Sequence, residues 1–380
     1  MKRSFLTILC MTILLLTGCT QAEQSGKSKL PPKSDITEKN IKDVFAEHGM
    51  KAGTCISSMV IDGQAMEKMI LEQFNSVTTE NAMKPDSILS QEKSRAQGDI
   101  VVEFSDETIK LLNWAKANGY AMRGHTLIWY SQTPEWIFHQ SFDENLGYVG
   151  REEMLSRMET FIKGVFEELD RLDYLDMFYA YDVVNEGIME DGSIRESNWS
   201  DIIGDDYIWY AFYYADKYAP ESVDLYYNDY NEQYKAEYVC ELARTLVDED
   251  GRSLIDGIGM QAHFFTSDDL DVYFEEVDKL AETGLKMQLT EVDVGLGKYL
   301  YPDVATLDRL KYQGQFYYTL INGLFELADA GKINMDAITF WGFTDAASWR
   351  SEYTAQLFDD ELLPKYAYYG AMQIKEYAGY

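Results

Sequence analysis

The strongest constraint on the fold is a regular alternation of short apolar runs with longer amphipathic segments from residue 36 onward. Eight runs have the length of buried parallel strands. They are residues 52–58, 74–79, 121–128, 179–185, 224–228, 258–262, 287–291 and 338–343. Between them, segments such as 152–169 and 268–280 carry apolar residues at helical spacing. Because no Pro-, Gly- or Ser-rich linker interrupts this series, we predict one α/β domain over residues 36–380, a single (β/α)8 TIM barrel.

The composition allows a large core and excludes some partners. Of the 380 residues, 46% are hydrophobic, which is enough for one barrel of this size. The formal net charge of -32 excludes nucleic acid as a partner, because binding phosphates requires an excess of Lys and Arg. The sequence has no Cys/His cluster and no Gly-rich phosphate loop, so we expect neither a metal nor a cofactor. Cys55 and Cys240 are expected to be buried free thiols, and the oligomeric state stays open.

The N-terminus has the features of a targeting segment. A basic start precedes an apolar run over residues 5–16, which is too short to span a bilayer comfortably. The run ends in Leu16-Thr-Gly-Cys19, which resembles the lipobox of bacterial lipoproteins. We therefore predict a lipoprotein signal peptide over 1–18, and a lipidated Cys19 with a flexible tether over 19–35. This implies an extracytoplasmic protein, at the cell surface or facing the periplasm, that contacts a membrane only through its lipid anchor. The alternative is an ordinary secretory signal with an incidental cysteine.

Two strand-like runs end in glutamate. Tyr181-Asp-Val-Val-Asn-Glu186 and Leu289-Thr-Glu291 are rich in Val, Leu and Tyr, and each glutamate stands at the C-terminal end of such a run. In a (β/α)8 barrel that end is the catalytic face. Hydrolysis of a glycosidic bond needs one carboxyl group to protonate the departing oxygen and another to attack or to activate water. A single glutamate is more often a solvated loop residue, so this interpretation depends on the neighbouring residues.

Polar and aromatic residues follow the other predicted strands. Amides, imidazoles, a lysine and indoles that converge on two glutamates would form a cleft that binds sugars. The residues are Glu80, Asn81, Lys84, His125, Trp129, Gln132, Asn185, Asn228, Tyr230, Gln261, His263, Asp293, Trp341 and Trp349.

These residues lie in motifs that resemble glycoside hydrolase family 10, the endo-β-1,4-xylanases. The motifs follow the order of the family and cover essentially the whole chain after the tether. They are Thr79-Glu-Asn-Ala-Met-Lys84, Arg123-Gly-His-Thr-Leu-Ile-Trp129, Ser131-Gln-Thr-Pro-Glu-Trp136, Asp182-Val-Val-Asn-Glu186, Tyr227-Asn-Asp-Tyr-Asn231, Gly257-Ile-Gly-Met-Gln-Ala-His263, Thr290-Glu-Val-Asp293 and the run from Thr339 to Arg350.

The resemblance implies a role for each matching residue. Glu186 would be the acid/base and Glu291 the nucleophile. Asn185 would bind the sugar 2-hydroxyl, while His263, held by Asp293, would orient the nucleophile. The residues implied to bind substrate are Glu80, Asn81, Lys84, His125, Trp129, Gln132, Tyr230, Gln261, Trp341 and Trp349.

Three positions depart from the pattern of the family. Tyr130 stands where the family commonly has His, Tyr181 where it often has Trp, and Ala82 where many members have Glu. None of these changes removes a catalytic group. The change at Tyr130 puts in doubt how the acid/base is tuned.

The resemblance implies a retaining endo-1,4-β-xylanase that acts on xylan and xylooligosaccharides without a cofactor. Two alternatives stay open at this point. One is a sugar-binding surface lipoprotein, which would release no reducing ends from xylan. The other is a family member that prefers a β-glucan, because one hydroxymethyl group separates the two sugar rings and discrimination of that kind is modest. The number of subsites and the pH optimum do not follow from the sequence.

Overall fold

The computed structural model describes residue 30 and residues 33–297 and 305–380. The predicted signal peptide, the predicted lipidation site Cys19 and most of the predicted tether lie outside these residues. Within the part of the chain that is described, no helix is long and apolar enough to cross a bilayer. Cys55 and Cys240 are both buried and unpaired, as expected, and burial raises the pKa of each thiol.

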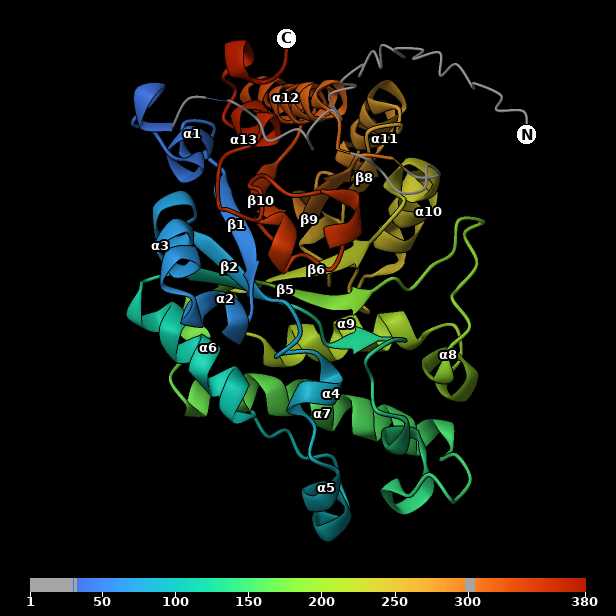
Figure 1. Cartoon of the computed structure of the whole chain (residues 1–380). Coiled ribbons are helices and arrows are strands. Elements are labelled where there is room, and N and C mark those ends of the chain that lie inside the picture. Colours follow the sequence, from blue (N-terminus) through green and yellow to red (C-terminus); the bar gives the residue numbers. More distant parts are fainter. Residues whose placement is uncertain (1–29, 31–32, 298–304) are drawn as a thin grey trace, which may run out of the picture.

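Eight parallel strands form a closed barrel, which confirms the predicted (β/α)8 fold (Figure 1). The last strand pairs with both the first strand and its own predecessor, and this double pairing closes the sheet. The strands are β1 (Lys51–Ile56), β2 (Ser76–Thr79), β3 (Ala121–Gly124), β5 (Phe178–Asn185), β6 (Asp224–Asp229), β7 (Gly257–Met260), β9 (Lys286–Gly295) and β10 (Met335–Phe340). Two short strands, β4 (Ile128–Trp129) and β8 (His263–Phe265), extend the pairing of β5 and β9.

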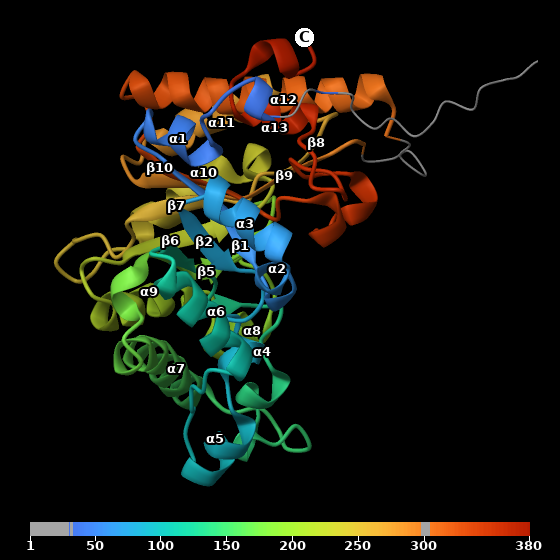
Figure 2. The same cartoon turned by 60° about the vertical axis from the view of Figure 1, so that its left-hand side comes forward.

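Helices surround the barrel (Figures 1 and 2). The α-helices are α1 (Ile41–Ala46), α2 (Ser58–Asp62), α3 (Gln64–Gln73), α4 (Pro85–Ile88), α5 (Gln91–Gln97), α6 (Asp106–Ala117), α7 (Arg151–Arg171), α8 (Asn198–Ile203), α9 (Tyr207–Tyr218), α10 (Glu232–Thr245), α11 (Leu270–Ala281), α12 (Leu307–Asp329) and α13 (Tyr366–Ala371). Short 3-10 helices are η1 (Lys33–Asp35), η2 (Glu135–Phe138), η3 (Gln140–Phe142), η4 (Leu175–Met177), η5 (Asp345–Ala347), η6 (Ser351–Tyr353) and η7 (Lys375–Tyr377).

Side-chain caps define where several helices begin. The Ser105 hydroxyl accepts a hydrogen bond from the Thr108 amide at the start of α6, and Thr306 caps α12 in the same way. The Asp269 carboxylate accepts bonds from two amides of α11. Each such cap satisfies an amide that has no partner within the helix, and each is worth about 1 kcal/mol.

Most predicted strands agree with the structure to within a few residues, with two informative differences. The run predicted over 121–128 is divided into β3 and β4, because residues 125–127 leave the β3 ladder while the Leu127 amide bonds the Asp182 carbonyl. The run predicted over 338–343 ends at Phe340, because the chain turns at Gly342 with a φ of 107°. That conformation is one that glycine adopts readily.

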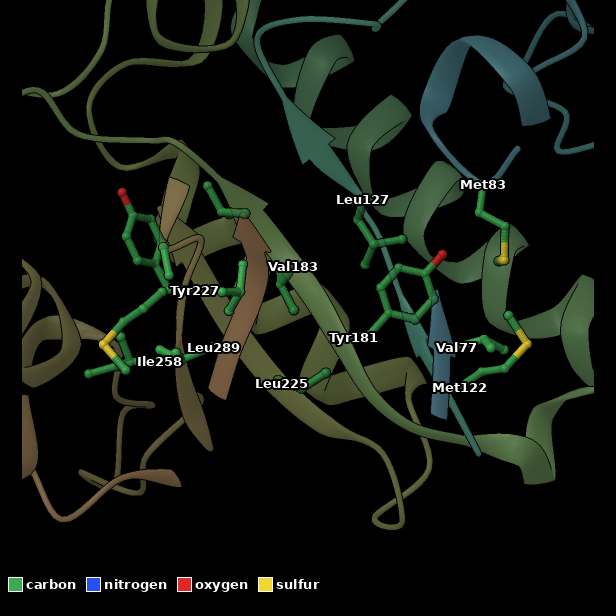
Figure 3. Close-up of a cluster of buried hydrophobic side chains, with 14 of the residues drawn as sticks. Val77, Met83, Met122, Leu127, Tyr181, Val183, Leu225, Tyr227, Ile258 and Leu289 are labelled. Carbon is green, nitrogen blue, oxygen red and sulfur yellow. The ribbon is translucent and has the colours of Figure 1, made fainter. Parts of the chain in front are cut away.

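Side chains from successive strands pack together to form the core (Figure 3). Val77 of β2, Met122 of β3, and Tyr181 and Val183 of β5 are among these side chains, and all four are fully buried. Each such side chain contributes roughly 1.5–3 kcal/mol when it is removed from water. The Tyr181 ring lies against Gly124, where an added Cβ would be 2.3 Å from the ring. The absence of a side chain at Gly124 on β3 therefore leaves the space that the Tyr181 ring of β5 occupies.

Helix α1 lies at the end of the barrel where the strands begin. The Ile41 amide donates to Gln73 Oε1 at 3.3 Å, and Gln73 Nε2 donates to Asn40 Oδ1 at 2.9 Å. Gln73 ends α3, directly before β2 starts, whereas Glu80 follows the other end of β2. The first described segment of the chain is thus attached to the face opposite the strand ends that carry the predicted site.

Candidate active site

A cavity of about 920 Å³ opens at the C-terminal ends of the barrel strands. This volume lies within the usual range of a ligand site, about 300–1,000 Å³. The structure brings together in it all ten residues that the sequence predicted to bind substrate, namely Glu80, Asn81, Lys84, His125, Trp129, Gln132, Tyr230, Gln261, Trp341 and Trp349. Asn185, Glu186, His263 and Glu291 also line the cavity.

Glu186 follows β5 directly and is held in an unusual backbone conformation. Its φ is 57°, in the left-handed region, which costs a residue with a side chain about 1–3 kcal/mol. The Glu186 amide donates to the Asn228 carbonyl of β6 at 2.8 Å. Its side chain is 8% exposed, and Oε1 accepts hydrogen bonds from Gln261 Nε2 at 2.9 Å and from Asn185 Nδ2 at 3.2 Å. The carboxyl group is therefore fixed by amides rather than by a cation.

Glu291 lies within β9 and faces different partners. Its Oε1 accepts a hydrogen bond from Asn228 Nδ2 at 2.9 Å. Its Oε2 lies 3.4 Å from His263 Nε2, and its Oε1 lies 4.0 Å from His125 Nδ1. The Glu291 carboxylate is therefore placed between two imidazoles.

An amide network joins the two carboxyl groups. Asn228 Nδ2 donates to Asn185 Oδ1 and to Glu291 Oε1, both at 2.9 Å. Asn185 in turn bonds Glu186, and the Thr290 hydroxyl orients the Asn228 amide by donating to its Oδ1 at 2.6 Å. Residues from β5, β6 and β9 thereby hold both glutamates in one connected arrangement.

A second network orients His263. Its Nδ1 lies 3.1 Å from Asp293 Oδ1, an ion-pair distance without the geometry of a hydrogen bond. Asp293 is fully buried and accepts hydrogen bonds from Trp349 Nε1 at 3.0 Å and from Arg350 Nη1. The order of contacts Asp293, His263, Glu291 is the one that the sequence predicted.

The charges of this network set the protonation of the two residues. Burial raises the pKa of Glu291, but the charges of His125 and His263 and the contact with His263 outweigh it and lower the value to about 2. Burial lowers the pKa of His263, but Asp293 and Glu291 raise it to about 10. At neutral pH, Glu291 is therefore an anion beside a protonated imidazole. A carboxylate in this state can act as a nucleophile.

Lys84 donates hydrogen bonds to two amide side chains at the end of the cavity next to β2. Lys84 Nζ donates to Gln132 Oε1 at 2.7 Å and to Asn81 Oδ1 at 3.0 Å, and it lies 4.9 Å from the centre of the Trp129 ring. Burial raises the pKa of the neighbouring Glu80 carboxyl group and lowers that of Lys84. This end of the cavity is an ordered set of donors and acceptors suited to hydroxyl groups.

Two indoles of the cavity differ in their exposure. Trp341 is 5% exposed and contacts the edge of His125, with ring centres 5.3 Å apart. Trp349 is 59% exposed, although its indole nitrogen bonds Asp293. Trp341 is therefore a buried wall of the cavity, whereas Trp349 lies on a loop and is largely exposed to solvent. Both present flat apolar faces of the kind that sugar rings stack on.

The three departures from the pattern of the family lie in different environments. Tyr130 is 46% exposed at the cavity, and burial together with the negative charge of Glu186 raises the pKa of its phenol. Tyr181 is a core residue. Ala82 is buried, and its carbonyl accepts a hydrogen bond from the Thr108 hydroxyl at 2.7 Å. Only Tyr130 touches the cavity next to a predicted catalytic residue.

Some residues of the site were not predicted from the sequence. Asn231, Phe265, Glu352 and Tyr353 also line the cavity, and Arg195 Nε donates to the Glu186 carbonyl at 2.6 Å. Arg195 belongs to the segment between β5 and α8, whose conformation no periodic pattern specifies. Asn228 stands at a predicted strand end, so its position was foreseen, but its link between the two glutamates was not. Among the described residues, no group of His, Cys, Asp and Glu side chains has the arrangement of a metal site.

Comparison with known proteins gives a consistent match. The model of the family described as Glycosyl hydrolase family 10 matches residues 40–374. Endo-1,4-beta-xylanase B of Butyrivibrio fibrisolvens is 34% identical over 350 residues, which are 88% of this chain and 53% of that protein. The Geobacillus stearothermophilus endo-1,4-beta-xylanase is 31% identical over 351 residues, which are 88% of this chain and 98% of that protein.

A solved structure shows the same similarity in three dimensions. The endo-1,4-beta-D-xylanase of Clostridium thermocellum, determined in complex with xylohexaose, matches with a TM-score of 0.79 and 32% identity. The match covers 90% of this chain and 68% of that one. The chain spans about half of the length of the Butyrivibrio protein and about a third of that of other similar relatives. Those longer proteins therefore contain further regions that this match does not cover.

Proposed function

The chain belongs to glycosyl hydrolase family 10, and from this membership we propose that it is a retaining endo-1,4-β-xylanase acting on xylan and xylooligosaccharides. The observation that carries the proposal is the amide network that holds Glu186 and Glu291 in one cavity. Hydrolysis of a glycoside with retention needs two carboxyl groups on opposite sides of the scissile bond, one of them ionised.

In the first step, the Glu291 carboxylate attacks the anomeric carbon. The bond to the leaving oxygen breaks as Glu186 gives that oxygen its proton, which leaves a glycosyl ester on Glu291 and an ionised Glu186. The His263 cation and Asn228 hold Glu291 in place for this attack. Asn185 lies between the two carboxyl groups, where its amide can bond the sugar 2-hydroxyl.

In the second step, Glu186 accepts a proton from water, and the water oxygen attacks the same anomeric carbon. The ester bond to Glu291 breaks, both carboxyl groups return to their starting states, and the product keeps the β configuration. The same residue thus acts first as acid and then as base. No cofactor enters either step.

The ends of the cavity support a polymeric sugar as the substrate. Lys84, Asn81 and Gln132 offer fixed donors and acceptors on one side of the glutamates, and Tyr230 lies on the other. An open cavity with polar contacts on both sides of the cleavage point favours attack within a chain rather than at its end.

Two measurements separate this proposal from its two alternatives: release of reducing ends, and relative specificity for xylosides and glucosides. A sugar-binding lipoprotein would produce none from xylan, whereas the proposed enzyme produces short oligomers of mixed length. Equal specificity constants on matched aryl xylobioside and cellobioside would contradict the preference for xylan, and a larger constant on the cellobioside would favour the β-glucan alternative. We expect a preference of about 10- to 200-fold for the xyloside, because a glucose hydroxymethyl group would have to fit beside Glu80, Lys84 and Trp341.

We also propose that the protein is a lipoprotein anchored through Cys19, outside the cytoplasm. The basic start, the apolar run over 5–16 and the small residues before Cys19 support this.

A further inference from the structure

Arg195 contacts the predicted acid/base and two residues of the cavity wall at once. Its Nε donates to the Glu186 carbonyl at 2.6 Å, and its Nη2 donates to the Tyr230 hydroxyl at 2.9 Å. The centre of its guanidinium lies 4.6 Å from the Tyr130 ring and 5.7 Å from the Tyr230 ring. Both tyrosines line the cavity, and Arg195 itself is half-buried. One guanidinium group therefore links Glu186 to both aromatic side chains.

The Glu186 carbonyl belongs to a residue with an unusual backbone conformation. The left-handed conformation of Glu186 is unfavourable and persists only if its surroundings fix it. The amide of Glu186 is fixed by the Asn228 carbonyl of β6, while its carbonyl is fixed by Arg195. A hydrogen bond from a charged donor is stronger than one between neutral groups. The two peptide units that flank the Glu186 Cα are thus both held by hydrogen bonds.

We propose that Arg195 is a positioning residue for proton donation by Glu186, an inference that rests on the proposed glycosidase function. It fixes the carbonyl of the acid/base, bonds the Tyr230 hydroxyl, and places its charge over the Tyr130 ring. A lysine could reach the carbonyl, but its single ammonium group lacks the fork of donors that bonds the carbonyl and the Tyr230 hydroxyl together. Loss of Arg195 would therefore displace the proton donor without removing it.

A displaced proton donor has a specific kinetic signature. Cleavage of an aryl glycoside with a poor leaving group, such as phenol, requires a proton on the departing oxygen, whereas dinitrophenolate leaves without one. Displacement of Glu186 should slow the first reaction and spare the second. An arginine that merely braces its loop would instead reduce stability, and with it the rates on all substrates equally.

The test compares Arg195→Met and Arg195→Lys with wild type on aryl β-xylobiosides of graded leaving-group acidity. The control is Arg151→Met, because Arg151 also donates to a main-chain carbonyl, that of Ile203, and packs over a tyrosine, Tyr210, at 5.5 Å. Melting temperatures are recorded for all variants. If Arg195→Met does not fold, Arg195→Lys carries the test.

We expect kcat/KM of Arg195→Met to fall roughly 10- to 100-fold on the phenyl substrate, because small displacements of a catalytic group have effects of this size. On the dinitrophenyl substrate the fall should be no more than about threefold, since no proton is needed there. Arg195→Lys should lie between, and Arg151→Met should match wild type on both. An equal loss on all substrates, or no loss, overturns the role of Arg195. Failure of the wild type to hydrolyse any xyloside would instead overturn the proposed function.

Discussion

The two glutamates differ in the groups that surround them, and the difference fits the roles proposed for them. Glu291 is bonded by Asn228 and lies beside two imidazoles, which keep it ionised. Glu186 is bonded by the neutral amides of Gln261 and Asn185. A nucleophile must be an anion, whereas an acid must be able to hold a proton and then release it. These surroundings therefore suit Glu291 to the role of nucleophile and Glu186 to the role of acid/base.

Glu291→Ala and Glu186→Ala should differ in kind. Loss of the nucleophile should reduce hydrolysis of every xyloside to background. Loss of the acid/base should lower kcat/KM on xylan by about 10²- to 10⁴-fold, yet preserve the first step on dinitrophenyl xylobioside. Azide should then accelerate Glu186→Ala and give a β-azide, because a small anion can replace the activated water. An α-anomer as the first product of the wild type, seen by NMR, would contradict both assignments.

His263→Asn should move the acid limb of kcat/KM to higher pH. In the wild type, the pKa of Glu291 is about 2, so the carboxylate stays ionised at low pH. Removal of the neighbouring cation removes much of this effect, and an opposite charge at such a distance is worth about 1–3 pH units. His48→Asn is the matched control, because His48 contacts Asp329 and stacks on Phe325 on the outside of the barrel. An unmoved limb in His263→Asn would show that this cation does not govern Glu291.

The same shifts predict how stability depends on pH. The folded-state pKa of Glu291 lies below its ordinary value of 4.5, so its contribution to the free energy of unfolding is present above that value and is lost as pH falls toward 2. The pKa of His263 is raised from 6.5 to about 10, so its contribution is present below pH 6.5 and is lost as pH rises through 10. Chemical denaturation across pH, compared with His263→Asn, measures the second contribution directly.

At the scale of single elements, the sequence predicted the barrel strands and the residues at their ends, because strands and helices give regular patterns of apolar residues and loops do not. Glu186 and Glu291 both line the cavity, as predicted, because parallel strands carry the residues of their C-terminal halves to one face of the barrel; Glu186 directly follows β5, whereas Glu291 lies within β9, four residues before its end. Strand β8 was not predicted, since three residues carry no pattern, and β9 continues to Gly295 because it pairs with β8. Arg195 was not predicted either, because its position depends on contacts that form only when the loop after β5 folds against Tyr130.

The fit between β3 and β5 can be tested with one methyl group. Gly124→Ala would place a carbon 2.3 Å from the Tyr181 ring, so the ring or the strands must move. Overpacking of this kind costs about 1–3 kcal/mol. Gly147→Ala is the control, because its new methyl would meet only Gln140 Nε2, at 3.8 Å, and should change stability by less than about 0.5 kcal/mol. The midpoints of denaturant unfolding report both values, and equal midpoints would contradict the proposed fit.

At the scale of the whole molecule, the proposed anchor gives a clear expectation. Wild-type protein should enter the detergent phase in a phase separation of membranes, and Cys19→Ser should stay in the aqueous phase or remain unprocessed. Cys55→Ser serves as the control, because that thiol is buried within the barrel and should not affect partitioning. Equal partitioning of wild type and Cys19→Ser would contradict lipidation.

The position of α1 places the N-terminal part of the described chain and the cavity at opposite ends of the barrel. The chain enters beside Gln73, where the strands begin, while Glu186 and Glu291 face outward at the far end. A lipid on Cys19 would therefore attach the enzyme, through the predicted flexible tether, on the side away from its opening. A stiff polysaccharide could then lie across the opening without touching the point of attachment. Attachment and hydrolysis would therefore use different surfaces of the barrel.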